Sequence, residues 1–463
     1  MPKGLSSYFG PRKGQILGLF DFVSQFKQPV DVGATHEERE IKEKYRYWRF
    51  RVFYSMYIGY ALFYFTRKSF TFAMPGMIND LGFDKSELGF LGSMLAITYG
   101  ISKFLSGILS DKSSLRYFMS IGLVLTGVAN IFFGLSSSIM LFALFLAMNG
   151  FFQGWGAPPC AKLLSYWYSQ TERGRWWGLW NTSHNIGGAL IPLLCAFAIQ
   201  TFGWRYAMYA PGVAAIVTGF FLMNRIRDRP SEVGLPDVEV FRHDIGCHED
   251  DKQDKESAKD VLIKYVLKNK FMWILAISFF FVYIVRTAVN DWICLYLIEV
   301  KGYSVFLASS CVSWFEIGGM FGSLTAGWLS DTIFRGKRGP VNVMFSAGVG
   351  VVLLSWFFMP GSSIAMMSTL MFTVGFFIFG PQMLIGMAAA ELAGKKAAGS
   401  ATGFVGFFAY MGAAVAGYPV GKITQTYGWP GFFMLLACCS AIATTLLFPL
   451  WSKKPHGEVV ATN

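Results

Sequence analysis

The stretch GILSDKSSLR, from Gly107 to Arg116, occurs a second time in altered form as GWLSDTIFRGKR, from Gly327 to Arg338. The aspartates of the two copies are 220 residues apart (331 − 111), and other segments repeat at a similar offset. NGFFQGWGAPP from Asn149 aligns with VGFFIFGPQ from Val374 at an offset of 225 (374 − 149). A repeat of this length predicts that the chain folds as two structurally similar halves.

The composition indicates that these halves fold in a lipid bilayer. Hydrophobic residues make up 54% of the 463 residues and charged residues only 15%. Apolar stretches of about 20 residues are long enough to cross about 30 Å of hydrocarbon as α-helices. We expect an all-α membrane protein with twelve transmembrane helices in two pseudo-symmetric six-helix bundles. The expected helices are 49–74, 88–110, 117–137, 140–162, 176–200, 206–224, 270–298, 304–330, 341–359, 363–390, 397–420 and 430–450.

The charged segments suggest the boundaries between parts of the chain. Residues 225–269 are rich in charge, proline and glycine, which predicts a cytoplasmic central loop. The loop separates an N-terminal bundle, 49–224, from a C-terminal bundle, 270–450. Residues 1–48 and 451–463 are expected to be cytoplasmic tails, and the first helix is expected to direct insertion without cleavage.

The distribution of basic residues predicts the orientation in the bilayer. Cytoplasmic loops carry an excess of lysine and arginine. With both termini inside, nine such residues fall on short inner loops and four on outer loops. The inner ones are Lys112, Arg116, Arg173, Arg175, Arg335, Lys337, Arg338, Lys395 and Lys396, and the outer ones are Lys85, Arg205, Lys301 and Lys422. We therefore expect both termini to be cytoplasmic, in the inner (plasma) membrane, and the net charge of +12 needs no nucleic-acid partner.

Two arginines stand inside stretches of transmembrane length. Arg67 lies in IGYALFYFTRKSF and Arg286 in FFFVYIVRTAVNDW, 219 residues later (286 − 67). An arginine at bilayer depth costs about 2.5 to 3.5 kcal/mol on insertion scales, so it faces a partner or a watery cavity. A guanidinium binds phosphate with two parallel hydrogen bonds, so this repeated pair predicts an anion site between the halves. The alternative is neutralisation by a nearby carboxylate, which applies more to Arg286.

Other polar residues of the predicted helices are candidates for the same site. They are Lys103, Tyr99, His184, Asn181, Tyr283 and Tyr410. Lys103 lies close to a helix end, where extension of its side chain to the lipid headgroups is the alternative. His184 is the only histidine in a predicted helix, and a lone histidine is often a packing residue. The phenols can donate hydrogen bonds to an anionic ligand.

Two acids lie in the second half, Asp291 and Glu316. They are expected to bind sugar hydroxyls, to balance the cations, or to couple a proton. Lys68 follows Arg67 directly and points about 100° away from it around the helix. We expect Lys68 to contact the other half rather than the ligand.

The repeated pattern G-x-x-x-D with basic residues after it resembles the loop signature of the major facilitator superfamily. Its residues are Gly107, Asp111 and Arg116 in the first copy and Gly327, Asp331 and Arg335 in the second. We expect them to form a conformational-switch motif. One copy is a moderate signal, whereas two copies in register are strong.

Within that superfamily the chain resembles the organophosphate:phosphate antiporter family. The resemblance covers 45–450 and rests on blocks such as GYALFYFTRKSF, ITYGISKFLSGILSDKS, FFQGWGAPPCAKLL, GLWNTSHNIGGALIP and VRTAVNDW. It implies exchange of glycerol 3-phosphate or hexose 6-phosphates for inorganic phosphate, with Arg67, Lys103, His184 and Arg286 in the site. The greatest similarity is to bacterial hexose-phosphate carriers and sensors and to the glucose 6-phosphate translocase of animals.

The function expected is therefore a hexose phosphate antiporter, with glucose 6-phosphate the foremost substrate, that exchanges it for inorganic phosphate. The alternatives are a membrane sensor of hexose phosphate partnered with a histidine kinase, and a glycerol 3-phosphate:phosphate antiporter. A drug or ion-coupled sugar transporter would not need two midplane arginines. The sequence has no H-E-x-x-H, P-loop or nucleophile elbow, so an enzyme is not expected. We expect a monomer without metal or cofactor.

Overall fold

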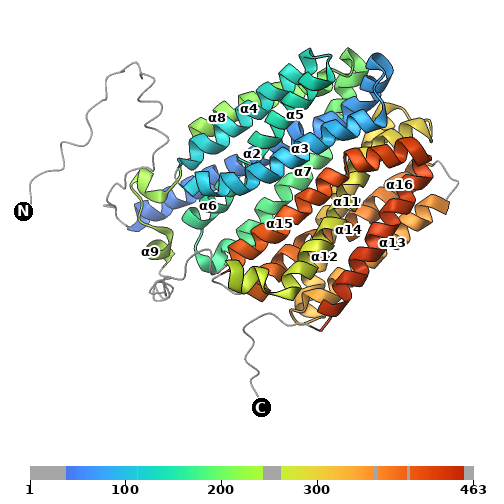
Figure 1. Ribbon diagram of the computed structural model, residues 1–463. Coiled ribbons are helices and arrows are strands. Elements are labelled where there is room, and N and C mark those ends of the chain that lie inside the picture. Colours follow the sequence, from blue (N-terminus) through green and yellow to red (C-terminus); the bar gives the residue numbers. More distant parts are fainter. Residues whose placement is uncertain (1–37, 112, 243–261, 359–362, 394–396, 453–463) are drawn as a thin grey trace, which may run out of the picture.

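The computed structural model describes residues 38–111, 113–242, 262–358, 363–393 and 397–452 (Figure 1). In these ranges, nine helical segments have the length and hydropathy of a membrane span, and one of them contains both α15 and α16. Adding α2 and α3, which are as long but more polar, gives the twelve passes expected. The all-α prediction is confirmed.

Each half contributes six passes. In the first half they are formed by α2 (Glu38–Leu81), α3 (Lys85–Asp111), α4 (Leu115–Leu135), α5 (Ile139–Gln153) with α6 (Ala157–Trp167), α7 (Gln170–Phe202) and α8 (Tyr206–Arg225). In the second they are α11 (Lys270–Glu299), α12 (Val305–Thr332), α13 (Arg338–Phe358), α14 (Ile364–Ala393), α15 (Ala398–Val415) and α16 (Tyr418–Leu447). Shorter elements are η1 (Pro230–Val233), α9 (Val238–Arg242), η4 (Leu262–Leu267) and η5 (Phe448–Leu450).

Glycine and proline explain where the observed helices depart from the predicted ones. The pass predicted at 140–162 is split into α5 and α6, with glycine at 154 and 156 and proline in the first turn of α6. The element α16 contains a break at Gly428, which has φ 67°. Its first part, from Tyr418, therefore continues the pass predicted at 397–420, and the pass predicted at 430–450 starts after the break. The first helix begins at Glu38 rather than at 49, since its polar turns continue the helix beyond the apolar stretch.

The two ends of the bundle differ. The start of α2 and the end of η5 lie at one end of the molecule, which we call the termini face (Figure 1). The opposite end, where α2 connects to α3, is the far face. These names describe the fold without assigning either end to a side of the membrane.

The two halves are in close contact at the far face. A Cβ placed on Gly89 of α3 would lie 2.6 Å from the carbonyl oxygen of Gly417, just before α16. The Ser93 hydroxyl donates to the Ala414 carbonyl at 2.6 Å, and Lys85 forms a 3.0 Å ion pair with Glu299. Backbone from one half therefore touches backbone from the other.

Toward the termini face the halves separate. Asn185 on α7 reaches the second half, and Gly178 lies two helical turns away on the same side of that helix. Tyr410 on α15 reaches the first half, and Gly403 lies two turns away on the same side. A Cβ on either glycine would meet nothing within 4 Å. The contact between halves is thus lost in this direction.

Part of the predicted central loop is packed on the first half. The Asp228 carboxylate accepts hydrogen bonds from the backbone amides of Leu115 and Arg116 at 2.9 and 2.7 Å, which satisfies the start of α4. Tyr45 stacks on Phe241 with ring centroids 4.0 Å apart. This part of the predicted central loop therefore forms short helices that pack on the first half, while 243–261 lies outside the described residues.

A buried acid lies in the same segment. Burial, together with the charge of Asp228, raises the pKa of Glu232 to about 7. The Glu232 carboxylate accepts from the backbone amides of Asp228 and Arg229 at 2.9 and 3.3 Å.

The predicted switch motif is only partly described. The side chain of Asp111 and the surroundings of Gly107 lie outside the described residues. Arg116 donates through Nε to the carbonyl of Met223, and so ties α4 to α8.

The second copy of the motif lies within the described residues. Asp331 pairs with Arg338, which also binds Glu391 at 2.8 Å. The reason is the turn between them, where Arg335 has φ 50° and Gly336 has φ 81°. This left-handed turn brings Arg338 back to Asp331. Gly327 lies on the last turns of α12, where a Cβ would be 3.5 Å from Met383.

Candidate functional site

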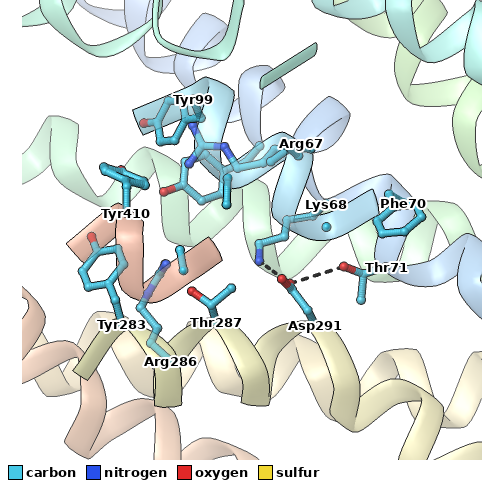
Figure 2. A pocket seen from close by; sticks show the side chains of 15 residues that line it. Arg67, Lys68, Phe70, Thr71, Tyr99, Tyr283, Arg286, Thr287, Asp291 and Tyr410 are labelled. Carbon is cyan, nitrogen blue, oxygen red and sulfur yellow. Dashed lines mark hydrogen bonds and ion pairs between the residues drawn. The ribbon is translucent and has the colours of Figure 1, made fainter. Parts of the chain in front are cut away.

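A cavity of about 690 Å³, counted with its mouth, lies between the two halves. Its walls come from α2 and α3 of the first half and α11 and α15 of the second (Figure 2). Six of the residues predicted for the site line it: Arg67, Tyr99, Tyr283, Arg286, Asp291 and Tyr410. The repeat therefore predicted the location of the cavity correctly.

Arg67 is held between aromatic rings and an amide. Its guanidinium carbon lies 4.4 Å from the ring centre of Tyr64 and 4.3 Å from that of Tyr99. Its Nε donates to Oε1 of Gln153 at 3.3 Å. Its Nη2 is buried and has no hydrogen-bond partner among the described residues.

Arg286 has a more apolar environment. Its guanidinium carbon lies 4.9 Å from the ring centre of Phe379 and 5.7 Å from that of Tyr283. The side chain is buried, and within the described chain neither its Nε nor its Nη2 has a hydrogen-bond partner. Within the described chain no carboxylate lies within ion-pair distance of Arg286, and the Asp291 carboxylate binds Lys68 and Thr71.

The two arginines thus face one cavity from opposite halves with unused donors (Figure 2). A buried cation with unsatisfied N–H groups is costly, and an anion that accepts from those groups removes the cost. The geometry is suited to an oxyanion with several acceptor oxygens, such as phosphate.

Phenols surround the arginines. Tyr99 and Tyr410 come from different halves and meet edge to face, with centroids 4.6 Å apart. Tyr283 lies against Tyr410 at 5.7 Å. Tyr64 also lines the cavity, and the sequence interpretation missed it. The offset of 219 residues pairs Tyr64 with Tyr283 (283 − 64), so the repeat contained the signal.

An ion pair crosses between the halves at the edge of the cavity. Lys68 Nζ lies 2.6 Å from Oδ1 of Asp291, which also accepts from the Thr71 hydroxyl at 3.3 Å (Figure 2). Both charged residues are mostly shielded from solvent. The contact of Lys68 with the other half agrees with the prediction, and for Asp291 it favours charge balance.

Breaking this pair is expected to impair both folding and function. Lys68→Ala or Asp291→Ala leaves a shielded charge without a partner, whereas the double alanine variant removes both charges. We expect each single variant to lower the melting temperature, by about 2 to 4 °C per kcal/mol lost. The double variant should recover part of that loss, as measured by thermal unfolding in detergent. Equal loss in all three variants would contradict a direct ionic contact.

Glu316 lies outside the cavity lining. It is buried in α12, where its carboxylate accepts from Asn290 at 3.1 Å and from Asn185 of the first half at 3.2 Å. A Cβ on Gly188 would be 2.7 Å from its carboxyl carbon. Glu316 therefore ties the two halves together, and the expectation of a sugar contact is not met in this conformation.

The remaining predicted residues lie around the cavity rather than in its lining. Lys103 is exposed, and its Nζ lies 3.5 Å from the Tyr410 hydroxyl, toward the termini face. His184 is buried behind the wall, with its ring 5.4 Å from that of Tyr64 and 6.0 Å from that of Phe379. Its Nε2 has no hydrogen-bond partner in the described chain. Asn181 is half-buried one turn away.

Several contributors were not predicted. Thr71 and Thr287 line the cavity, while Gln153, Asn185 and Asn290 bind the charged residues. Thr71 lies one turn from Arg67 and Thr287 one turn from Tyr283, so helical spacing could have found both. The three amides could not be found in this way, because their partners lie on other helices.

Comparisons with known proteins agree with this fold. The profile described as Major Facilitator Superfamily matches residues 56–417. The "Probable hexose phosphate transport protein" of Chlamydia trachomatis is 56% identical over 438 residues, covering 92% of this chain and 96% of its own. The "Membrane sensor protein UhpC" of Escherichia coli is 50% identical over 436 residues, covering 93% and 99%.

A solved structure gives the same fold. A bacterial homologue of the human lysosomal transporter Spinster, in an inward-facing and occupied conformation, superposes with a TM-score of 0.69 at 13% identity. The match covers 87% of this chain and 97% of that one. The resemblance inferred from sequence is confirmed, and the chain is a multi-pass membrane protein that belongs to the Major Facilitator Superfamily.

Proposed function

We propose that the protein exchanges a hexose phosphate, foremost glucose 6-phosphate, for inorganic phosphate by alternating access. The observation that supports this most directly is the pair Arg67 and Arg286, one from each half, with unused donors toward one cavity. The hexose phosphate transport protein of C. trachomatis, at 56% identity, supports the choice of substrate.

Arg67 and Arg286 together act as a clamp on phosphate, and this clamp explains why exchange is obligatory. Two guanidinium groups repel each other in an empty cavity, and a phosphate that accepts from both draws the halves together. A ligand shifts a conformational equilibrium only by its difference in affinity for the two states. A phosphate held by both arginines supplies that difference, so the loaded protein crosses between states and the empty one does not.

Sugar recognition is assigned to the polar side chains beyond the arginines. Thr287 and Thr71 line the cavity near Asp291, and they offer hydroxyls for the sugar (Figure 2). Such groups stay unpaired when inorganic phosphate is bound, which disfavours the smaller ligand. Lys103 and His184 are proposed to join the phosphate site during closure.

The proposal also includes the orientation of the protein in the membrane. We place the termini face in the cytoplasm and the protein in the inner (plasma) membrane, acting as a monomer that leaves its substrate chemically unchanged. The structure then corresponds to a state whose site opens to the cytoplasm.

A sensor is the second candidate, because the membrane sensor protein UhpC is 50% identical to this chain. A sensor would bind hexose phosphate at the same site and signal to a kinase. Proteoliposomes distinguish the two functions. Vesicles loaded with phosphate are expected to take up labelled glucose 6-phosphate, and empty vesicles are not.

Each other outcome has a distinct meaning. Equal uptake by loaded and empty vesicles would contradict exchange, and binding without flux would identify a sensor. Glycerol 3-phosphate is added as a competitor to test the remaining substrate class. If it inhibits uptake more strongly than unlabelled glucose 6-phosphate does, the choice of a hexose phosphate is contradicted.

A further inference from the structure

Arg67 is connected to a buried chain of amides in the first half. Gln153, on α5, is 1% exposed, and its Oε1 accepts from Arg67 Nε at 3.3 Å. Its Nε2 donates to the Thr66 hydroxyl and to Oδ1 of Asn149, both at 2.9 Å. Since the amide nitrogen is fully used by two acceptors, only the carbonyl oxygen can face Arg67.

The chain continues from α5 to α4 and back to α2. Asn149 Nδ2 donates to Oδ1 of Asn130 at 2.6 Å and to the Thr66 carbonyl at 2.9 Å. Asn130 Nδ2 in turn donates to the Ser69 hydroxyl at 2.9 Å. Each amide therefore has one orientation fixed by its neighbours, and buried networks that are fully satisfied are rigid.

The second half has no counterpart to this chain. The repeat offset of 225 places Val374 and Ile378 at the positions of Asn149 and Gln153 (374 − 149 and 378 − 153). Both are buried apolar residues. Accordingly Arg286 Nε has no partner in the described chain, and its guanidinium lies over the Phe379 ring. The two arginines are related by the repeat but are held differently.

We infer that Gln153 is a positioning residue that fixes the Arg67 guanidinium as a preset phosphate anchor, whereas Arg286 adjusts to the ligand. This inference rests on the proposed function, because it assigns a ligand to the same site. Gln153 does not line the cavity, so it acts on phosphate through Arg67. A guanidinium that is already oriented loses less side-chain entropy when the anion binds.

Equilibrium binding of labelled inorganic phosphate to the purified protein tests the role of Gln153. Gln153→Met keeps the length of the side chain and removes the amide, and it is expected to weaken phosphate binding about tenfold. The matched control is Ser69→Ala, which breaks the far end of the same chain without touching Gln153 or Arg67. It is expected to lower the melting temperature while phosphate affinity stays within about twofold.

A double-mutant cycle separates positioning from a general structural role. In an Arg67→Lys background, Gln153→Met is expected to cause no further loss of phosphate binding. An equal tenfold loss there, or unchanged binding in a folded Gln153→Met protein, would overturn the inference. If Gln153→Met does not fold, Gln153→Asn is used, whose shorter amide withdraws from Arg67 and is expected to weaken binding similarly. A wild-type protein that binds no phosphate would overturn the proposed function instead.

Discussion

Replacing Arg67 or Arg286 by lysine is expected to reduce hexose phosphate:phosphate exchange by about 100-fold or more, while insertion and folding stay intact. Lysine keeps the charge but loses the planar fork that binds two phosphate oxygens at once. Each lost hydrogen bond to a charged group costs about 1.5 to 3 kcal/mol, so the loss of two accounts for the expected factor. The measurement is initial rate of exchange in proteoliposomes with matched protein content.

A surface arginine provides the control. Arg205 donates to the carbonyls of Gly134 and Ser136 at 2.7 and 2.6 Å, away from the cavity. Arg205→Lys is expected to keep exchange within about twofold of the wild type, since neither contact reaches the cavity. If Arg67→Lys or Arg286→Lys exchanged at the wild-type rate, phosphate binding by both arginines could not be part of the mechanism.

The second large effect is expected at the far face, where Gly89→Ala and Gly417→Ala should displace the protein from the conformation seen here. A Cβ on Gly417 would lie 2.5 Å from the carbonyl oxygen of Gly89 and 2.4 Å from the Ser93 hydroxyl. Backbone atoms cannot move aside as a flexible side chain can, so the two halves must separate. Overpacking of this kind costs about 1 to 3 kcal/mol, which shifts the population about 5- to 150-fold.

Distances between spin labels report that shift. Labels at Asn79→Cys on α2 and Tyr427→Cys on α16 occupy exposed positions near the far face. Alanine at Gly89 or Gly417 should lengthen the distance between them. Gly178→Ala and Gly403→Ala, where an added Cβ meets nothing within 4 Å, should leave it unchanged. Identical distance distributions in all four variants would contradict a closed far face.

Much of this architecture is predictable from the sequence because the bilayer and the repeat impose simple rules. Apolar length predicts the helices, and the repeat pairs Arg67 with Arg286 across the axis. Errors occur where local conformation decides the outcome. Gly154, Gly156 and the proline after them split one predicted pass into α5 and α6, and a left-handed turn at Arg335 brings Arg338 to Asp331, a pairing that helical spacing does not predict.

Inside the site, contacts between different helices limit what can be predicted from the sequence. Polar residues on the same turn as an arginine can be found by helical spacing, as Tyr283 was. The role of Glu316 stayed open among three alternatives because its position on α12 does not reveal that Asn185 of α7 reaches it. Gln153 was overlooked for the same reason, since its contact with Arg67 depends on how α2 and α5 pack.

The amide chain of the first half also has a consequence for biogenesis. Thr66, Asn130, Asn149 and Gln153 belong to three separate helices and satisfy one another. Each of these helices, inserted alone, would expose polar groups to hydrocarbon at a cost of several kcal/mol per unsatisfied group. These three helices of the first half are therefore expected to pair before they are fully exposed to lipid, whereas α14 of the second half, with valine and isoleucine in the places of Asn149 and Gln153, needs no such partners at these two positions.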